Sequence, residues 1–361
     1  MVFRADHVGS LLRPTQLVAA RRDHRAGRVD RDDLRRIEND CIAQAVRRQE
    51  QVGLAVVTDG DFRRENWWID FVRKIPGVAI GRSDGNAAFA GHSHVPLHVA
   101  VNGRIGWDGS ILADDAARLL AMTAATAKVT LPSPTRIHFH GGDAAVAQEA
   151  YADIAAFWDD VAAFYRREIA ALETVGCRYI QIDDPMMSYF VDDFHRANML
   201  ARGLDPDSTL ARYVSVINAC VAARGPDTRL ALHICRGNAR SSWVATGVYA
   251  RIADIVFPEL DVDALLLEYD DDRSGDFAPL KLVPDRVSVV LGLLSSKHPT
   301  LEHVDTILHR IDQATRFVPL DRLALSPQCG FASTEEGNLL NEDDQWRKLA
   351  LVVEIASRVW G

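Results

Sequence analysis

The sequence predicts an α/β protein folded as a single (β/α)8 barrel over residues 1–361, with a β-hairpin inserted between the second and third strands. Three observations support this prediction. Short apolar runs rich in β-branched residues recur along the chain, longer amphipathic segments separate most of them, and the length suits one barrel with an insertion. The sequence gives no sign of a second core, an internal repeat or a low-complexity linker.

Eight apolar runs are predicted as the barrel strands, because each is short, rich in strand-forming residues and bounded by turn residues. In chain order they are residues 5–10, 54–60, 127–133, 178–184, 229–235, 264–270, 286–292 and 322–328. Apolar residues at helical spacing predict helices between most of these strands, at 30–52, 152–175, 208–223, 301–316 and 340–358. Strands that alternate with helices in this way are typical of a parallel barrel.

The stretch between the second and third strands is too long for one helix. Residues 78–110 are rich in Gly and His, and they contain the alternating run HVPLHVAVNGRIGW. The pair Asn102-Gly103 is a strong hairpin-turn signal. We therefore expect an inserted hairpin with this pair at its turn, forming a flap on the barrel and not a separate domain.

Composition limits the kind of protein. The N-terminus MVFRADHVGS lacks the pattern of a signal peptide, and the chain lacks an apolar run long enough to span a membrane, so we expect a soluble cytoplasmic protein without a membrane partner. A formal charge of -9 disfavours nucleic acid as a partner. Five scattered cysteines predict reduced thiols. The locally basic stretch 20–36 is interleaved with aspartates, which predicts a solvated helix face. The sequence leaves open whether the protein forms a homo-oligomer.

Polar side chains gather at the predicted carboxyl ends of the strands, which is where barrels of this type build their active sites. Random placement would scatter such residues over both ends of the barrel. From the first strand to the last, these residues are His7, Ser10, Asp59, Asp61, Asp183, Asp184, His233, Cys235, Glu268, Ser295, Lys297 and Cys329.

Four of these residues suit a Zn(II) site: His233, Cys235, Glu268 and Cys329. Side chains two apart on a strand point the same way, so an imidazole and a thiol would converge at the end of the run RLALHIC. Two thiolates, an imidazole and a carboxylate suit tetrahedral zinc. Taken singly, a buried cysteine is usually a small hydrophobe and a glutamate after a strand a solvated residue. Their convergence favours a metal site.

Six motifs carry a family resemblance: HVGSLLRP, VTDGDFRREN, YIQIDDP, LHIC, LLLEYD and LSPQCGF. In their order and strand positions they resemble the cobalamin-independent methionine synthase family, both its catalytic C-terminal barrel and its short single-barrel relatives, including epoxyalkane:coenzyme M transferase-like proteins. The resemblance covers nearly the whole chain. It implies that the four residues above bind a catalytic zinc and that Ser10, Asp61 and Asp183 hold an amino-acid thiol. We add His7 to the substrate-binding set, and Asp183 and Lys297 as catalytic candidates.

The implied reaction is transfer of an alkyl group, a methyl group in the methionine synthases, to a small thiol such as homocysteine. A free thiol with a pKa of about 8.5 is mostly protonated at neutral pH, and coordination to a metal deprotonates it, so that its sulfur becomes a ready nucleophile. The alkyl donor stays open between a folate, a corrinoid protein and an epoxide. Thiol addition to an epoxide or another electrophile is the alternative reaction. Two other classes remain: a zinc-dependent hydrolase with Asp183 as general base, or a non-catalytic zinc- or thiol-binding protein.

The sequence departs from the family pattern at four positions. Asp61 and Asp184 stand where the methionine synthases have glutamates, and Ser295 and Lys297 stand where those enzymes have an aspartate and a histidine. Lys297 has three interpretations of equal weight: a proton donor, a ligand for an anionic group, or a solvated loop lysine. Trp67-Trp68 predict helix packing in the core, with a stacking platform for a flat donor as the alternative.

Overall fold

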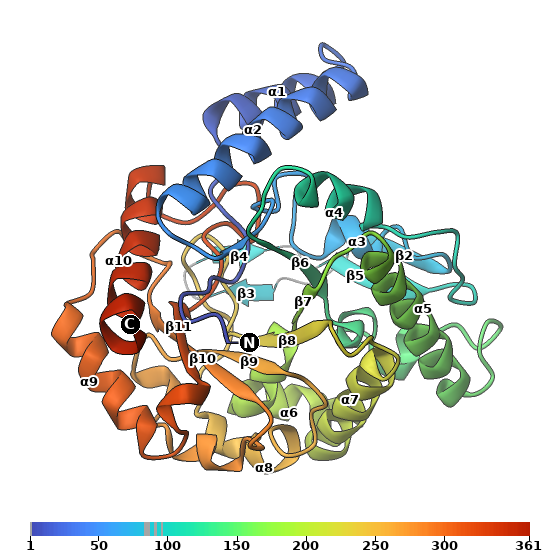
Figure 1. Ribbon diagram of the computed structural model, residues 1–361. Coiled ribbons are helices and arrows are strands. Elements are labelled where there is room, and N and C mark those ends of the chain that lie inside the picture. Colours follow the sequence, from blue (N-terminus) through green and yellow to red (C-terminus); the bar gives the residue numbers. More distant parts are fainter. Residues whose placement is uncertain (1, 83–86, 90–91, 95–96) are drawn as a thin grey trace.

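The computed structural model describes residues 2–82, 87–89, 92–94 and 97–361. Its main sheet contains seven parallel strands in the order β1-β6-β7-β8-β9-β10-β11. These are β1 (Val56–Val57), β6 (Thr126–Pro132), β7 (Tyr179–Asp183), β8 (Arg229–Ile234), β9 (Ala264–Glu268), β10 (Ser288–Leu294) and β11 (Leu323–Pro327). Helices surround the strands when the molecule is viewed along the barrel axis (Figure 1). The predicted α/β barrel is confirmed, and seven of its eight strands lie where the sequence predicts them.

The eighth position of the barrel is filled by an irregular segment instead of the strand predicted at 5–10. Ala5 forms a single parallel bridge to Leu325 on β11, and on the other side the carbonyl of Gly9 accepts a hydrogen bond from the Thr58 hydroxyl at 2.6 Å. The Asp6 carboxylate accepts the N–H of His7, and Gly9 has a φ of 138°, so the backbone cannot continue as a ladder. The segment closes the barrel without being a strand.

The helices on the outside of the barrel begin at side-chain caps that the sequence encodes. Asp30, Asp153 and Asp205 each accept a backbone N–H of the first helical turn, and Asn341 forms a capping box with Asp344. The helices are α1 (Thr15–Arg25), α2 (Arg31–Gln51), α3 (Ile69–Val72), α4 (Ala113–Leu120), α5 (Ile154–Thr174), α6 (Asp193–Ala201), α7 (Pro206–Val221), α8 (Ala253–Val256), α9 (Val304–Thr315) and α10 (Glu342–Trp360). All five predicted helices are present, each within three residues of its predicted limits.

The insertion after the second strand position is an antiparallel hairpin, as predicted. Strand β2 (Val78–Arg82) pairs with β5 (Leu97–Val101), and β3 (Ala87–Phe89) pairs with β4 (His92–His94) between them. Asn102-Gly103 is not at the turn: both N–H groups donate to the carbonyl of Gly77, so this pair follows β5 and closes the base of the hairpin. Val99 and Val101 are buried in the main core, which anchors the hairpin on the barrel.

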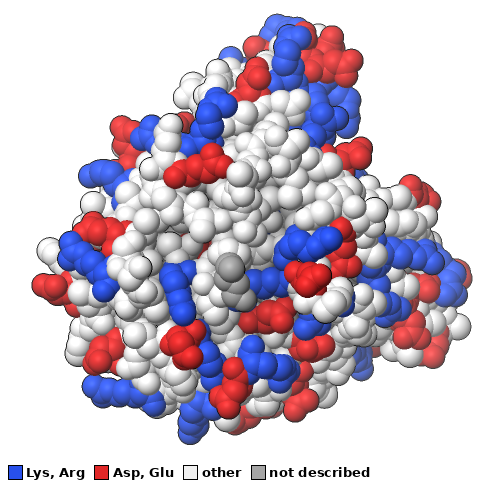
Figure 2. Space-filling view, in the orientation of Figure 1, with Lys and Arg blue, Asp and Glu red and all other residues white. Residues whose placement is uncertain are grey.

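Helices α1 and α2 project from the ring of helices (Figure 1). Over the face shown in Figure 2, Lys and Arg side chains are interspersed with Asp and Glu, including on the projecting pair, in agreement with the solvated face predicted at 20–36. All five cysteines are buried free thiols. In the part of the chain that the structure describes, every helix is too short or too polar to cross a membrane.

Candidate active site

Three of the four predicted zinc ligands lie together at the carboxyl ends of the strands. The ligand atoms of His233, Cys235 and Cys329 are all within 4.8 Å of one another, and all three residues are buried. His233 is the penultimate residue of β8 and Cys235 directly follows the strand, whereas Cys329 follows β11, on the opposite side of β9 and β10 in the sheet order. Closure of the barrel therefore brings together residues that are 94 positions apart in the chain.

The contacts of these three side chains fit a metal ion. Nδ1 of His233 donates to the carbonyl of Leu266 at 3.2 Å, which leaves Nε2 as the lone-pair nitrogen. Nε2 is buried without a hydrogen-bond partner among the described residues. The sulfurs of Cys235 and Cys329 are 3.7 Å apart. The hydrogen bond from Cys235 holds the pKa of Cys329 well below its usual value, while it raises that of Cys235. A nitrogen and two sulfurs are a donor set for zinc.

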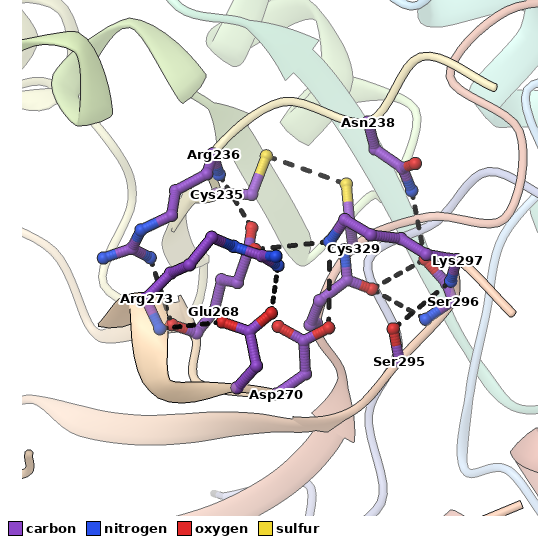
Figure 3. Close-up of polar contacts among 12 residues, drawn as sticks. Cys235, Arg236, Asn238, Glu268, Asp270, Arg273, Ser295, Ser296, Lys297 and Cys329 are labelled. Carbon is purple, nitrogen blue, oxygen red and sulfur yellow. Dashed lines mark hydrogen bonds and ion pairs between the residues drawn. The ribbon is translucent and has the colours of Figure 1, made fainter. Parts of the chain in front are cut away.

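Glu268, the fourth predicted ligand, lies beside this cluster and not within it (Figure 3). Its Oε2 accepts the backbone N–H of Arg236 at 2.7 Å, and its Oε1 lies 3.3 Å from Nζ of Lys297. The carboxylate is fully buried. Both carboxylate oxygens therefore have a partner within the protein. The backbone N–H of Arg236, the residue after Cys235, holds Glu268 next to the cluster.

Lys297 is buried, which excludes the interpretation as a solvated loop lysine. Burial lowers the pKa of its ammonium group, but the carboxylates of Glu268 and Asp270, at 3.3 and 3.8 Å, outweigh burial and raise it. The amine is therefore charged at neutral pH. Figure 3 shows dashed lines that join it to Glu268 and to Asp270.

Ser10, Asp61 and Asp183 lie around one small cavity with the three clustered ligands. This inner cavity has a volume of about 40 Å³. Its remaining lining residues are Val8, Trp67, Pro185, Gly237, Gly330 and Ser333. A Cβ at Gly330 would lie 2.0 Å from Oγ of Ser10, so a glycine after Cys329 is what allows Ser10 to approach. The three clustered ligands and these polar side chains thus face the same space.

His7 is not part of the inner cavity. It is buried beside Lys128, whose ammonium donates to the His7 carbonyl, and burial lowers the pKa of its imidazole to about 4. Asp184 is also outside the cavity: its carboxylate accepts hydrogen bonds from Ser133 and Thr135 and caps the 3₁₀ turn Pro185–Val191. The structure therefore assigns both residues structural contacts.

The two carboxylates of the inner cavity have different environments. Asp61, with a φ of 59°, lies 3.2 Å from the guanidinium of Arg64, yet burial still raises the pKa of its carboxyl group. Burial raises the pKa of Asp183 to about 7, although His233 opposes this and the amide of Gln181 donates to Oδ1 at 2.7 Å. Asp183 can therefore hold or release a proton near neutral pH.

Sequence reasoning missed the residues that hold this site in place. Lys128 forms an ion pair with Asp6 at 2.7 Å and donates to Gln181 at 2.9 Å, which fixes the amide that contacts Asp183. Ser296 donates to Gln328 at 2.7 Å and so orders the segment that carries Cys329. A lysine and a glutamine within otherwise apolar strands were the available signal, because buried polar groups need partners.

A second, outer cavity of about 770 Å³ adjoins the inner one. The two share Trp67, Pro185, Gly237 and Ser333 as lining residues. Trp68 belongs to the core, as predicted, and also lines the outer cavity; the guanidinium of Arg136 lies 3.5 Å from the centre of its ring. The site thus has a ligand cluster, an inner cavity and an outer cavity in contact with one another.

The comparisons with known proteins agree with this arrangement. The family described as "Cobalamin-independent synthase, Catalytic domain" matches residues 3–357. The chain is 43% identical to uncharacterized protein YxjH of Bacillus subtilis, over 99% of this chain and 95% of that protein. It is 24% identical to a methionine synthase of Sulfolobus acidocaldarius, over 90% and 84% of the two chains. The crystal structure of a putative vitamin-B12-independent methionine synthase from Listeria monocytogenes has a TM-score of 0.80 and 33% identity, covering 99% and 98% of the chains.

Proposed function

Because the chain belongs to the cobalamin-independent synthase catalytic-domain family, we propose that it is a zinc-dependent transferase that moves an alkyl group, specifically methyl, to the sulfur of a small thiol such as homocysteine. The observation that carries this proposal is the convergence of His233, Cys235 and Cys329 beside a cavity lined by Ser10 and two carboxylates. A metal-binding cluster of this composition needs an open side to act on a substrate, and the inner cavity gives it one.

The chemistry divides between the metal and the protein. Zinc, when bound, would supply the positive charge that keeps an acceptor sulfur deprotonated and nucleophilic at neutral pH. The protein binds the rest of the acceptor. Asp61 is placed to accept hydrogen bonds from an ammonium group, since one face of its carboxylate lines the inner cavity while Arg64 and Thr130 hold Oδ1. Asp183 is placed to accept the proton of the thiol and to pass it on to solvent, because its pKa is about 7.

The donor is proposed to occupy the outer cavity. Its volume of about 770 Å³ lies within the range of small-molecule binding sites, and Trp67 lines both cavities, so a group held there can point toward the sulfur of the acceptor. A folate or an epoxide would fit this cavity directly. A corrinoid protein would instead have to present its methyl group at the mouth of the cavity.

The experiment that tests the proposal counts the sulfur neighbours of the metal. We expect X-ray absorption at the zinc edge of the zinc-loaded protein to change from two sulfur neighbours to three when the correct thiol is added, with release of about one proton near neutral pH. Homocysteine, cysteine and a sulfonate thiol form the test panel. As the control for non-specific changes, the same X-ray absorption measurement is made after addition of a ligand of similar size that carries oxygen in place of the thiol sulfur.

Two results would count against the transferase. If the sulfur count stays at two for every thiol and the protons stay bound, a hydrolase or a zinc-binding protein becomes the better description, since a hydrolase keeps water at the open position. If a thiol without an amino group binds as well as homocysteine, the acceptor is not an amino acid. The second result would leave alkyl transfer in place and favour thiol addition to an electrophile.

A further inference from the structure

Arg136 is a buried cation at the wall of the outer cavity. It belongs to the 3₁₀ turn Pro134–Ile137, directly after β6, and only 4% of its surface is exposed. Its guanidinium stacks on Trp68 at 3.5 Å from the ring centre, and the residue lines the cavity of about 770 Å³. The side chain is therefore held rigidly by an aromatic ring at a position that a ligand can reach.

The described residues offer Arg136 neither an ion pair nor a side-chain hydrogen bond, and its Nη1 is buried without a partner. The other buried arginines of the barrel differ. Arg13 donates to the carbonyls of Asp61 and Ala332, Arg64 pairs with Asp61, and Arg236 donates to Gly247. Burial lowers the pKa of Arg136 to about 9, against a small opposing effect of two tyrosines. A buried charge without a counter-charge destabilises a fold, so its presence calls for a functional explanation.

The surroundings of Arg136 are basic and apolar. His98, His140, His195 and Arg202 line the same cavity, and burial, followed by repulsion from Arg136 and Arg202, lowers the pKa of His140. The acidic residues that line the cavity have partners other than Arg136: Glu65 and Glu335 pair with Arg25, and Glu336 accepts a hydrogen bond from the side chain of Thr334. The rest of this wall is formed by large apolar and aromatic side chains, namely Trp67, Phe139, Met186, Tyr189 and Met199.

We propose that Arg136 is the binding group for the oxyanion of an organic ligand, a carboxylate, sulfonate or phosphonate carried on an apolar or aromatic body that fills the outer cavity. A guanidinium fork that presents unused N–H groups matches such an oxyanion, and the apolar wall matches its body. Assigning this ligand as the alkyl donor rests on the proposed function, and in that case the donor is a small anion and neither a neutral epoxide nor a protein-bound corrinoid. The anion site itself does not depend on alkyl transfer.

The test uses aromatic probes in isothermal titration calorimetry with the zinc-loaded protein and without any thiol. Benzoate, benzenesulfonate and phenylphosphonate are compared with neutral benzamide, which has nearly the same shape as benzoate. We expect at least one anion to bind about tenfold more tightly than benzamide, and the preferred anion identifies the oxyanion class. Because thiol is absent, failure of the X-ray absorption test above would leave this result unaffected.

Three variants locate the effect. Arg136→Met should remove the preference for anions and leave benzamide binding unchanged, whereas Arg136→Lys should keep part of that preference through its charge. Arg202→Met is the matched control, since Arg202 lines the same cavity but is exposed and donates to the carbonyl of His140. This variant should lose less than about threefold of the wild-type affinity for the anions. The melting temperature of Arg136→Met should be unchanged or higher, because the variant removes an unpaired buried charge.

The proposal is overturned if the anions and benzamide bind equally, if none of the anions binds at its solubility limit, or if Arg136→Met keeps the wild-type preference. It is also overturned if Arg136→Met and Arg136→Lys both lower the melting temperature strongly while anion binding persists in the folded fraction, since Arg136 would then be a structural residue.

Discussion

Replacing Lys297 with methionine should separate the two roles that Glu268 can have, as partner of a lysine and as ligand of a metal. Nζ of Lys297 lies 3.3 Å from Oε1 of Glu268 and 3.8 Å from Asp270, and all three side chains are buried. Methionine has a similar length and no charge. The variant therefore leaves two buried carboxylates without their shared cation while it changes the packing little.

The size of the effect follows from these contacts. Removing one partner of a buried ion pair costs about 3–5 kcal/mol of unfolding free energy, because the remaining charge is uncompensated. Arg273 lies 3.8 Å from the same oxygen of Glu268, and the backbone N–H of Arg236 still donates to the other oxygen. We therefore expect the lower end of that range, about 3 kcal/mol, for the metal-free protein.

Zinc should reduce this loss if Glu268 turns toward the His233–Cys235–Cys329 cluster and becomes a ligand. A divalent cation then neutralises the carboxylate in place of the lysine, and we expect the loss to fall to about 1 kcal/mol. The difference of about 2 kcal/mol must appear as about 30-fold tighter zinc binding by the folded variant. Urea unfolding with a chelator and with zinc measures the first quantity, and competition with a zinc indicator measures the second.

Lys348→Met is the control, because Lys348 on the helix α10 is also a buried lysine, and it pairs with the partly buried Glu302 at 3.0 Å outside the cluster. Its loss of stability should be the same with zinc and with chelator. If Lys297→Met behaves like this control, and its zinc affinity equals that of the wild type, then Glu268 does not become a zinc ligand and the four-residue site reduces to three.

Three further predictions concern the cluster, the acceptor and the barrel interior. Cys235→Ser and Cys329→Ser should each lose most of their zinc, measured by mass spectrometry of the metal, while circular dichroism stays that of the folded barrel; full zinc content in both would contradict the assignment. Asp61→Asn should weaken binding of an amino-acid thiol by about tenfold at unchanged zinc content, since it removes the charge that faces the ammonium group; equal affinity would show that this carboxylate does not contact the acceptor. Below pH 6.5 His7 takes up a proton in the unfolded chain, whereas in the folded protein it stays neutral until about pH 4. The free energy of unfolding of the wild type should therefore fall by about 3 kcal/mol over this window, at 1.36 kcal/mol per pH unit. His7→Gln should show a correspondingly smaller fall in urea unfolding from pH 7 to pH 4. Parallel declines would contradict the burial of a neutral imidazole.

The barrel could be predicted from the sequence because most of its strand residues are apolar and because capping residues mark the starts of several helices. Runs such as 264–267 are apolar at every position, which is typical of a buried parallel strand, and Asp153 and Asn341 mark the starts of helices directly. The segment 5–10 was predicted as a strand but is irregular in the structure. Its backbone is satisfied by side chains such as those of Asp6 and Thr58, and such contacts between distant parts of the chain leave no periodic pattern.

The candidate site divides in the same way. The ligand types and their strand-end positions were readable from the sequence, and the structure brings His233, Cys235 and Cys329 together. The surroundings were not readable, because they depend on which side chains meet across the barrel. Lys297 could be a solvated residue or a buried one until its two carboxylate partners were seen, and Arg136 in the run SPTRIHF gives no indication in the sequence that it lacks a partner.

Burial of charge is the property that ties these parts together. Around the cluster three buried ion pairs lie within the protein, namely Lys297 with Glu268, Asp61 with Arg64, and Lys128 with Asp6, and the amide of Gln181 donates to Asp183. These pairs hold the inner cavity rigid before any substrate arrives, which lowers the cost of ordering it on binding. Arg136, unpaired among the described residues, departs from this pattern at the outer cavity, so the missing counter-charge there is best supplied by the ligand. A site with a paired interior and one unpaired cation at its outer wall would select its second substrate by charge.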